Sequence, residues 1–262
     1  MYEVGDTMVM KLNYLLNKLI FFMGFVICII IFCFCFQVTY VWYQDNKKTE
    51  NLTEDIYNSV SLEEDTDHLD VDLSTLINQN SDTKGWLKVE NTNINYPFVQ
   101  TSNNDYYLTH SFDKTSNEAG WVFLDFRNDI NNLSENTIIY AHDRLDKSMF
   151  GSLENTLSQD WYNNTNNHII KMATEKYHYE WQVFSTYVID TETYYIQTTF
   201  NTKEEYLDFL VTIKSRSQNQ YDVDLSTDDK ILTLSTCHGD YQKMVLHAKL
   251  IKVTKNTSFS NS

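Results

Sequence analysis

A run of apolar residues near the N-terminus constrains this chain more than any other feature. From Leu19 to Phe36 there is no charged residue, and further apolar residues extend the run to Trp42. A helix of about 20 residues, rising about 1.5 Å per residue, spans the ~30 Å hydrocarbon core of a bilayer. A cleavable signal peptide would have a shorter apolar region followed by a small-residue cleavage site, which this sequence lacks. We therefore predict an uncleaved transmembrane anchor over residues 19–42.

The anchor divides the chain into a short tail and a long C-terminal part. Residues 1–18 are too few to fold, and we expect them to be cytoplasmic, with the C-terminal part extracellular. The lysines on the two sides of the anchor balance each other, so the charges alone do not determine this orientation. We predict a solvated acidic stalk over residues 43–68, a folded domain over residues 69–254 and a polar tail over residues 255–262. The expected product is a single-pass protein of the cell membrane.

The folded domain is predicted to be mostly β. Short apolar runs bounded by Asn, Asp and Ser are typical of strands. About eight strands are predicted, at residues 86–89, 94–99, 121–125, 137–141, 168–173, 177–188, 231–236 and 243–253. This number of short strands in one domain favours a closed barrel.

Two helices are expected beside these strands. Apolar residues at helical spacing predict a short amphipathic helix over residues 69–80. A longer helix is predicted over residues 203–215, with Asn201 or Thr202 as its N-cap. Its apolar residues near one face are Tyr206, Leu207, Leu210, Val211 and Ile213.

The charge balance excludes one large class of partners. The chain has 20 Lys and Arg against 36 Asp and Glu, a formal net charge of −16. A nucleic-acid-binding protein neutralises phosphates with clustered basic residues, so we predict no nucleic-acid partner. A hydrophobic content of 42% excludes a disordered chain.

The cysteines are unevenly distributed. Three of the four lie in the apolar run, and Cys237 stands alone in the part expected outside the cell. A lone cysteine cannot form an intramolecular disulfide there. It is either a reactive thiol or a small buried hydrophobic residue. The histidines of the domain stand at no metal-ligand spacing, so no metal and no other cofactor are predicted.

Two predicted strands end at residues that can perform covalent chemistry. The strand over residues 231–236 is followed by Cys237, and the strand over residues 137–141 is followed by His142. Cysteine attacks as the thiolate, and a neighbouring imidazole favours that form and transfers the proton. Cys237 and His142 are therefore the candidate pair for acyl transfer.

The residues around both strand ends resemble a known family. Thr233-Leu234-Ser235-Thr236-Cys237 resembles the active-site signature of sortases, and Thr137-Ile138-Ile139-Tyr140-Ala141-His142 resembles their catalytic-histidine strand. Further stretches resemble class B of that family: residues 85–86, 93–100, 104–108 with His110 and Phe112, 123–128 and 148–151. The resemblance covers residues 69–254.

The resemblance implies a sortase-type β-barrel with an N-terminal helix and a long helix before the cysteine strand. It also implies a membrane-anchored cysteine transpeptidase of a Gram-positive-type cell surface. In that chemistry Cys237 attacks the carbonyl after the Thr of a Pro-x-Thr sorting signal and holds a thioacyl-enzyme. An amine of a cell-wall precursor or of a pilin then resolves it, and His142 transfers the protons.

One position departs from the family pattern. The family has a catalytic arginine after the cysteine, and counting back four residues from His247 places Lys243 there. No arginine lies beyond Arg216. Lysine supplies a single flexible charge instead of a planar fork, so we expect Lys243 to replace the arginine only in part. An ordinary surface lysine is the alternative.

Motif position also implies the residues that contact the sorting peptide. These are Asn104, Leu108, Thr191, Tyr195, Ile196 and Ser235. Tyr195 and Ile196 are expected to form a flat apolar wall for a proline-containing peptide. For each of the six, a packing or solvent-facing role is the alternative.

Two other functions stay open. A cysteine peptidase would cleave without transfer, although in papain-like enzymes the cysteine comes first and begins a helix. A binding module that has lost activity would explain the lysine at position 243.

Overall fold

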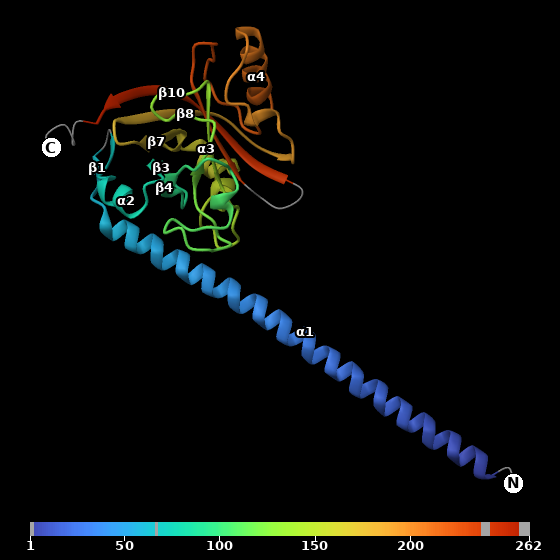
Figure 1. Ribbon diagram of the computed structural model, residues 1–262. Helices are drawn as coiled ribbons and strands as arrows, with labels where there is room; N and C mark the ends of the chain where they lie inside the picture. The colour runs from blue at the N-terminus through green and yellow to red at the C-terminus, as the bar shows by residue number, and fades with distance from the viewer. Residues whose placement is uncertain (1–2, 66–67, 237–241, 257–262) are drawn as a thin grey trace. The chain divides into compact units, whose positions relative to one another are not determined.

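The computed structural model describes residues 3–65, 68–236 and 242–256 (Figure 1). The chain divides into two compact units, residues 1–48 and residues 49–262. The first unit is helical and belongs to α1 (Glu3–Ser59). In the described part of α1, an 18-residue window has a mean hydropathy of 3.1 and none of it is buried. By length and composition this helix can cross a membrane, as predicted for residues 19–42.

The second unit is built on a closed barrel of eight strands, as predicted. The order around the barrel is β10-β8-β7-β3-β4-β5-β6-β9. Their bounds are β3 Thr83–Val89, β4 Asn95–Val99, β5 Phe123–Leu124, β6 Asn136–Ala141, β7 Ile169–Ala173, β8 Tyr177–Asp190, β9 Ile231–Thr236 and β10 Gln242–Lys255. Each contains or overlaps one predicted strand, because alternating and continuous apolar runs between turn residues specify strands locally.

Most neighbouring strands in the barrel are antiparallel, but two pairs are parallel. These are β4 with β5 and β6 with β9. Antiparallel pairing of β9 with β10 closes the barrel. The core is filled by large side chains that are fully buried, among them Trp86, Trp121, Trp181, Phe98 and Phe184.

Short elements connect the strands and cover the barrel. The helices are α2 Ser74–Gln79, α3 Gln159–Asn163 and α4 Lys203–Ser215, and the 3-10 turns are η1 Tyr106–Leu108, η2 Leu153–Leu157, η3 Thr165–His168 and η4 Tyr194–Ile196. Helix α4 lies outside the barrel beside β8 (Figure 1). It has the predicted bounds, and Thr202 is its N-cap. The predicted apolar face is partly wrong, because Leu207 and Val211 are exposed and Phe209 is buried instead.

The segment predicted as a solvated stalk differs in the structure. Residues 49–59 are the last part of α1 and pack on the barrel, where Ile56 is only 2% exposed. Tyr57 Oη donates a hydrogen bond to the carbonyl of Asn95. Asn117 Nδ2 donates to Thr49 Oγ1 over 3.0 Å. The acidic composition of this segment predicted a solvated stalk, although the residues that become buried recur at helical spacing.

A two-stranded sheet follows, formed by β1 (Leu62–Asp65) and β2 (His68–Val71). The predicted helix over residues 69–80 is therefore shorter and begins only at Ser74. Leu69, Val71 and Leu73 are buried at every second position, which is the period of a strand. Asp72 Oδ1 accepts from the amide of Ser74, the first residue of α2, over 2.8 Å.

Candidate active site

The carboxyl ends of β6 and β9 lie side by side. The two strands are parallel, and their last residues, Ala141 and Thr236, are register partners. His142 follows β6 directly. Cys237 follows Thr236 in the sequence and lies outside the described residues.

The imidazole of His142 is held by a backbone carbonyl. Its Nε2 lies 2.7 Å from the carbonyl oxygen of Leu108, at the end of η1. A carbonyl oxygen only accepts hydrogen bonds, so Nε2 carries a proton. In the neutral ring, Nδ1 is then the basic nitrogen.

Gly120 makes room for this arrangement. Its φ is +60°, in the left-handed region that favours glycine. A Cβ atom there would lie 2.5 Å from the Tyr107 carbonyl oxygen and 2.9 Å from both His142 Cδ2 and the Leu108 carbonyl oxygen. No side chain fits between the ring and these carbonyls, so the packing of His142 depends on this glycine.

Lys243 lies near the same end of the barrel. It pairs with Ile189 of β8, and the amide of the next residue, Met244, donates to Thr236 Oγ1 over 2.9 Å. Lys243, Thr236 and Asp143 also line one pocket of ≈ 190 Å³. The half-buried lysine is therefore grouped with the ends of both candidate strands.

The predicted peptide contacts fall into different environments. Tyr195 and Ser235 are brought together, with Tyr195 Oη 3.0 Å from Ser235 Oγ. Tyr195 is only 2% exposed in this structure, so most of its ring packs inside the domain. Thr191 is exposed just beyond β8, and Leu108 and Ile196 are half-buried.

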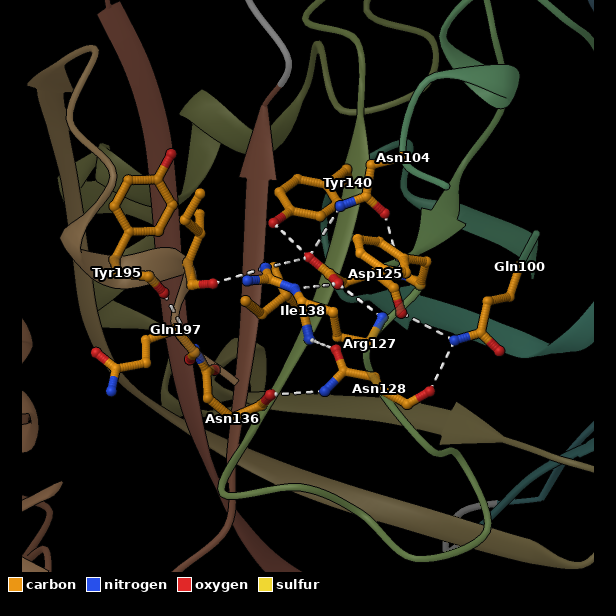
Figure 2. A network of polar contacts seen from close by, with 12 residues as sticks. Gln100, Asn104, Asp125, Arg127, Asn128, Asn136, Ile138, Tyr140, Tyr195 and Gln197 are labelled. Atoms are coloured by element: carbon orange, nitrogen blue, oxygen red, sulfur yellow. Dashed lines mark hydrogen bonds and ion pairs between the residues drawn. The ribbon is translucent and has the colours of Figure 1, made fainter. Parts of the chain in front are cut away.

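Sequence reasoning missed the role of a buried carboxylate beside these residues. Asp125 follows β5, and its side chain is 0% exposed. It accepts hydrogen bonds from Asn104 Nδ2 and Tyr140 Oη, both over 3.0 Å. Arg127 adds a bidentate ion pair, with its Nη2 2.6 Å and its Nε 2.8 Å from the two carboxylate oxygens. Figure 2 shows Asn104, Arg127 and Tyr140 turned toward Asp125.

The surroundings of Asp125 decide its charge. Burial by itself would raise the pKa of the Asp125 carboxyl, but the hydrogen bonds from Arg127 and Asn104 outweigh it and lower the pKa below its usual value. Asp125 is therefore ionised at neutral pH. The signal that could have pointed to it is an Asp and an Arg two residues apart immediately after a strand.

The same network reaches η4. Arg127 Nη2 also donates to the Ile196 carbonyl over 2.8 Å. Asn136 Nδ2 donates to the carbonyls of Tyr195 over 3.0 Å and of Gln197 over 2.9 Å. Two side chains therefore hold the backbone around η4: Asn136 of β6 and Arg127 of the segment after β5 (Figure 2).

A second network of buried side chains connects Tyr194 of η4 to His247. Thr233 Oγ1 donates to Asn136 Oδ1 over 2.6 Å, which uses its one proton. His247 Nδ1, 2.8 Å from Thr233 Oγ1, is therefore the donor of that bond. His247 Nε2 then accepts from Tyr187 Oη over 2.8 Å, and Tyr187 Oη accepts from Tyr194 Oη over 2.8 Å. Burial lowers the pKa of His247 to about 3, so the ring is neutral.

Among the described residues, no group of three or more His, Cys, Asp or Glu side chains could hold a metal ion. The described side chains at this end of the barrel that can transfer a proton or supply a positive charge include the imidazole of His142 and the ammonium group of Lys243.

Comparisons with known proteins point to one family. A family model described as the sortase domain matches residues 87–251. Sortase B of Staphylococcus aureus is 35% identical over 234 residues, which cover 87% of this chain and 94% of that protein.

Two solved structures are similar over most of the chain. The crystal structure of a Bacillus anthracis protein similar to sortase B has a TM-score of 0.69 and 35% identity, and the match covers 82% of this chain and 98% of that one. The Staphylococcus aureus sortase B–substrate complex has a TM-score of 0.65 and 37% identity, covering 69% of this chain and 84% of that one.

Proposed function

Because the chain belongs to the class B sortases and is therefore a cysteine transpeptidase, we propose that Cys237 is its nucleophile. The observation that carries this proposal is the parallel register of Ala141 with Thr236. The two neighbouring strands therefore end at the same end of the barrel, and each is followed in the sequence by a residue able to take part in acyl transfer. One of them is His142 and the other is the lone cysteine of the second unit.

The proposed reaction has two acyl transfers. The Cys237 thiolate attacks the carbonyl carbon of the Thr in a Pro-x-Thr sorting signal, and a C–S bond forms. The C–N bond breaks, and the leaving amine takes a proton from the His142 imidazolium. An amine of a cell-wall precursor or a pilin then attacks the thioacyl carbon and gives a proton to His142. The C–S bond breaks and the thiolate is regenerated.

The hydrogen bond of His142 supports a choice between its two nitrogens. Nε2 donates to the Leu108 carbonyl, so Nδ1 is the nitrogen that exchanges protons with substrate. The fixed ring costs little reorganisation during the reaction, since its orientation is set before the peptide binds.

Lys243 is proposed to supply the positive charge for the oxyanion, in place of the family arginine. Its position beside Thr236 and Asp143 supports this role. A lysine makes no bidentate contact, so backbone N–H groups near Cys237 are proposed to share the stabilisation of the oxyanion.

We expect Lys243→Ala to lower kcat by about 10²-fold, the usual effect of losing one oxyanion donor.

The peptide is proposed to lie between the segment of Asn104 and Leu108 and the segment of Thr191 and Ile196. Support comes from the structural likeness to a sortase B that was solved with substrate. Ser235 and Tyr195 are proposed to act together at this site, since their hydroxyl groups are 3.0 Å apart. The apolar helix supports anchoring of the protein in the cell membrane by residues 19–42. Residues 69–254 are proposed to be extracellular, because the proposed cell-wall acceptor lies outside the cell.

The test uses the full chain in detergent micelles with fluorogenic peptides of the Asn-Pro-x-Thr and Ser-Pro-x-Thr-Gly types. Each peptide is incubated with and without triglycine as the amine acceptor. We expect a triglycine-dependent product and a thioacyl adduct on Cys237 by mass spectrometry, both absent in Cys237→Ala.

Two other results would assign other functions. Cleavage without any triglycine product would make the protein a hydrolytic cysteine peptidase. Absence of the adduct with both peptides would favour a binding module, the function that Lys243 in place of arginine keeps open.

A further inference from the structure

Arg127 connects two parts of the site that are far apart in the sequence. Its Nε and Nη2 bind the Asp125 carboxylate, and the same Nη2 donates to the carbonyl of Ile196 over 2.8 Å. Ile196 belongs to η4, one side of the proposed peptide groove. The planar guanidinium holds both partners in one geometry, which a lysine could not do.

Asp125 connects the other side of that groove. Its Oδ2 accepts from Asn104 Nδ2 over 3.0 Å. The Asn104 Oδ1 in turn accepts from the amide of Phe126 over 3.0 Å. Both polar atoms of the Asn104 amide are therefore engaged with the segment after β5, so its side chain is fixed in position.

The same carboxylate also contacts the strand of the catalytic histidine. Asp125 Oδ2 accepts from Tyr140 Oη over 3.0 Å, and Tyr140 lies two residues before His142 in β6. A buried carboxylate with this many donors has little freedom to move, since any shift would leave a charged group unpaired. One buried charge therefore fixes three segments of the proposed site.

We propose that Asp125 and Arg127 are positioning residues for the sorting peptide. They hold the Asn104 segment and η4 at a set separation, and this separation determines how tightly the peptide binds. The inference rests on the proposed function, because it takes the space between these segments as the peptide groove. Neither residue transfers a proton or contacts the scissile bond in this account.

The test measures kcat and KM of the full chain in detergent micelles, with the peptide that the wild type cleaves and with triglycine. The variants are Asp125→Asn, Arg127→Gln, Arg127→Lys and the double variant Asp125→Asn/Arg127→Gln. A change confined to positioning of bound substrate raises KM and leaves kcat nearly unchanged. We expect about a tenfold higher KM for Arg127→Gln with kcat within about twofold of wild type.

The other variants add independent readouts. Arg127→Lys retains the charge and is expected to give an intermediate KM. The double variant is expected to match Arg127→Gln, because residues of one network are not additive. Peptide affinity is also measured by fluorescence anisotropy in a Cys237→Ala background, where no reaction occurs, and the Arg127 variants are expected to bind more weakly there too.

Lys252→Gln is the matched control. Its ion pair with Glu180 is 2.7 Å long, and the exposed fraction of Lys252, 44%, is close to the 38% of Arg127. Lys252 joins β10 to β8 away from the network, so KM should not change.

The results separate this inference from the proposed function. If the wild type gives no triglycine product, the proposed function fails. If the wild type is active and the Arg127 variants keep the wild-type KM and peptide affinity, the positioning inference alone is wrong, even where they unfold at a lower temperature. If Arg127→Gln and Asp125→Asn do not fold, Arg127→Lys in the Cys237→Ala background decides by its affinity.

Discussion

At the scale of single residues, the backbone decides how His142 can act. The Leu108 carbonyl accepts its Nε2 proton over 2.7 Å, and Gly120 leaves the space in which the ring meets that carbonyl. Charge at this scale is set by burial and partners: Asp125 stays ionised beside Arg127, while His247 is buried and neutral. The hydrogen bond from Nε2 fixes the orientation of the His142 ring, while partners and burial set the charge of Asp125 and of His247.

Gly120→Ala should impair catalysis and also lower stability, because the added Cβ would lie 2.5 Å from the Tyr107 carbonyl oxygen at a residue with a φ of +60°. A Cβ 2.9 Å from His142 Cδ2 must displace the ring, and a displacement near 1 Å can cost about 10²-fold in rate. We expect kcat to fall by that order, measured with the cleaved peptide and triglycine. Gly24→Ala is the control, since nothing lies within 4 Å of a Cβ built at Gly24. Equal kcat in the two variants would contradict this account of Gly120.

His247→Gln should change how stability depends on pH. The folded pKa of His247, about 3, lies below the unfolded value of about 6.5. Between these values the unfolded chain binds the additional proton, so wild-type stability falls as the pH is lowered, by up to about 1.4 kcal/mol per pH unit. The variant lacks this loss, so the difference in the free energy of unfolding between wild type and variant should become smaller from pH 7 to pH 4.5.

Thermal unfolding followed by fluorescence measures this difference. A difference that does not change with pH would contradict a neutral, buried His247.

At the scale of elements, helix α4 and turn η4 show two ways of holding a segment outside the barrel. Helix α4 is specified by its own sequence, with Thr202 as N-cap and Tyr206, Phe209, Leu210 and Ile213 buried. Turn η4 is too short for that. It is held by hydrogen bonds from residues of the barrel and of the segment after β5.

Thr202→Ala should lower stability without changing peptide kinetics. Thr202 Oγ1 accepts from the Glu205 amide over 3.1 Å, and loss of an N-cap costs about 1 kcal/mol. In a domain of this size, that lowers Tm by about 2–4 °C. Thermal unfolding and KM at 25 °C check both statements. An unchanged Tm would contradict the capping role, and Thr212→Ala serves as the control, because Thr212 lies within α4, away from its N-terminus.

At the scale of the whole molecule, the folded unit begins earlier than composition indicates. The unit extends over residues 49–262 and includes the last part of α1. Ile56 and Thr49 are buried against the barrel, although the surrounding segment is acidic. Residues 49–59 therefore belong to the folded unit and are not a solvated segment.

Truncation tests this boundary. A chain beginning at Thr49 should unfold at the same temperature as the full chain. A chain beginning at Val60 loses the burial of Ile56, worth about 1.5–3 kcal/mol, and the hydrogen bond from Tyr57 to Asn95. Its Tm should be several degrees lower. Equal unfolding temperatures for the two truncated chains would instead support the predicted solvated stalk.

The sequence by itself determined the apolar helix, the strands of the barrel and the bounds of α4. It left Asn201 and Thr202 as alternatives for the N-cap, and it predicted the pair Cys237 and His142. These features follow from residues that are close along the chain, because periodicity, turn residues and caps act locally. Residues 49–59 of the predicted stalk belong to the folded unit, and the predicted helix over residues 69–80 forms only from Ser74 to Gln79. In both segments the buried apolar residues have partners that lie elsewhere in the sequence.

Only the tertiary structure decided which distant residues meet. It paired Ala141 with Thr236 in parallel, buried Asp125 between Asn104 and Tyr140, and joined Arg127 to Ile196 across 69 residues of chain. It also placed the hydroxyl group of Tyr195 beside that of Ser235 in the interior of the domain. Such contacts depend on how the strands close into a barrel, and a buried charge or hydroxyl group takes whichever partner that closure places within hydrogen-bond distance.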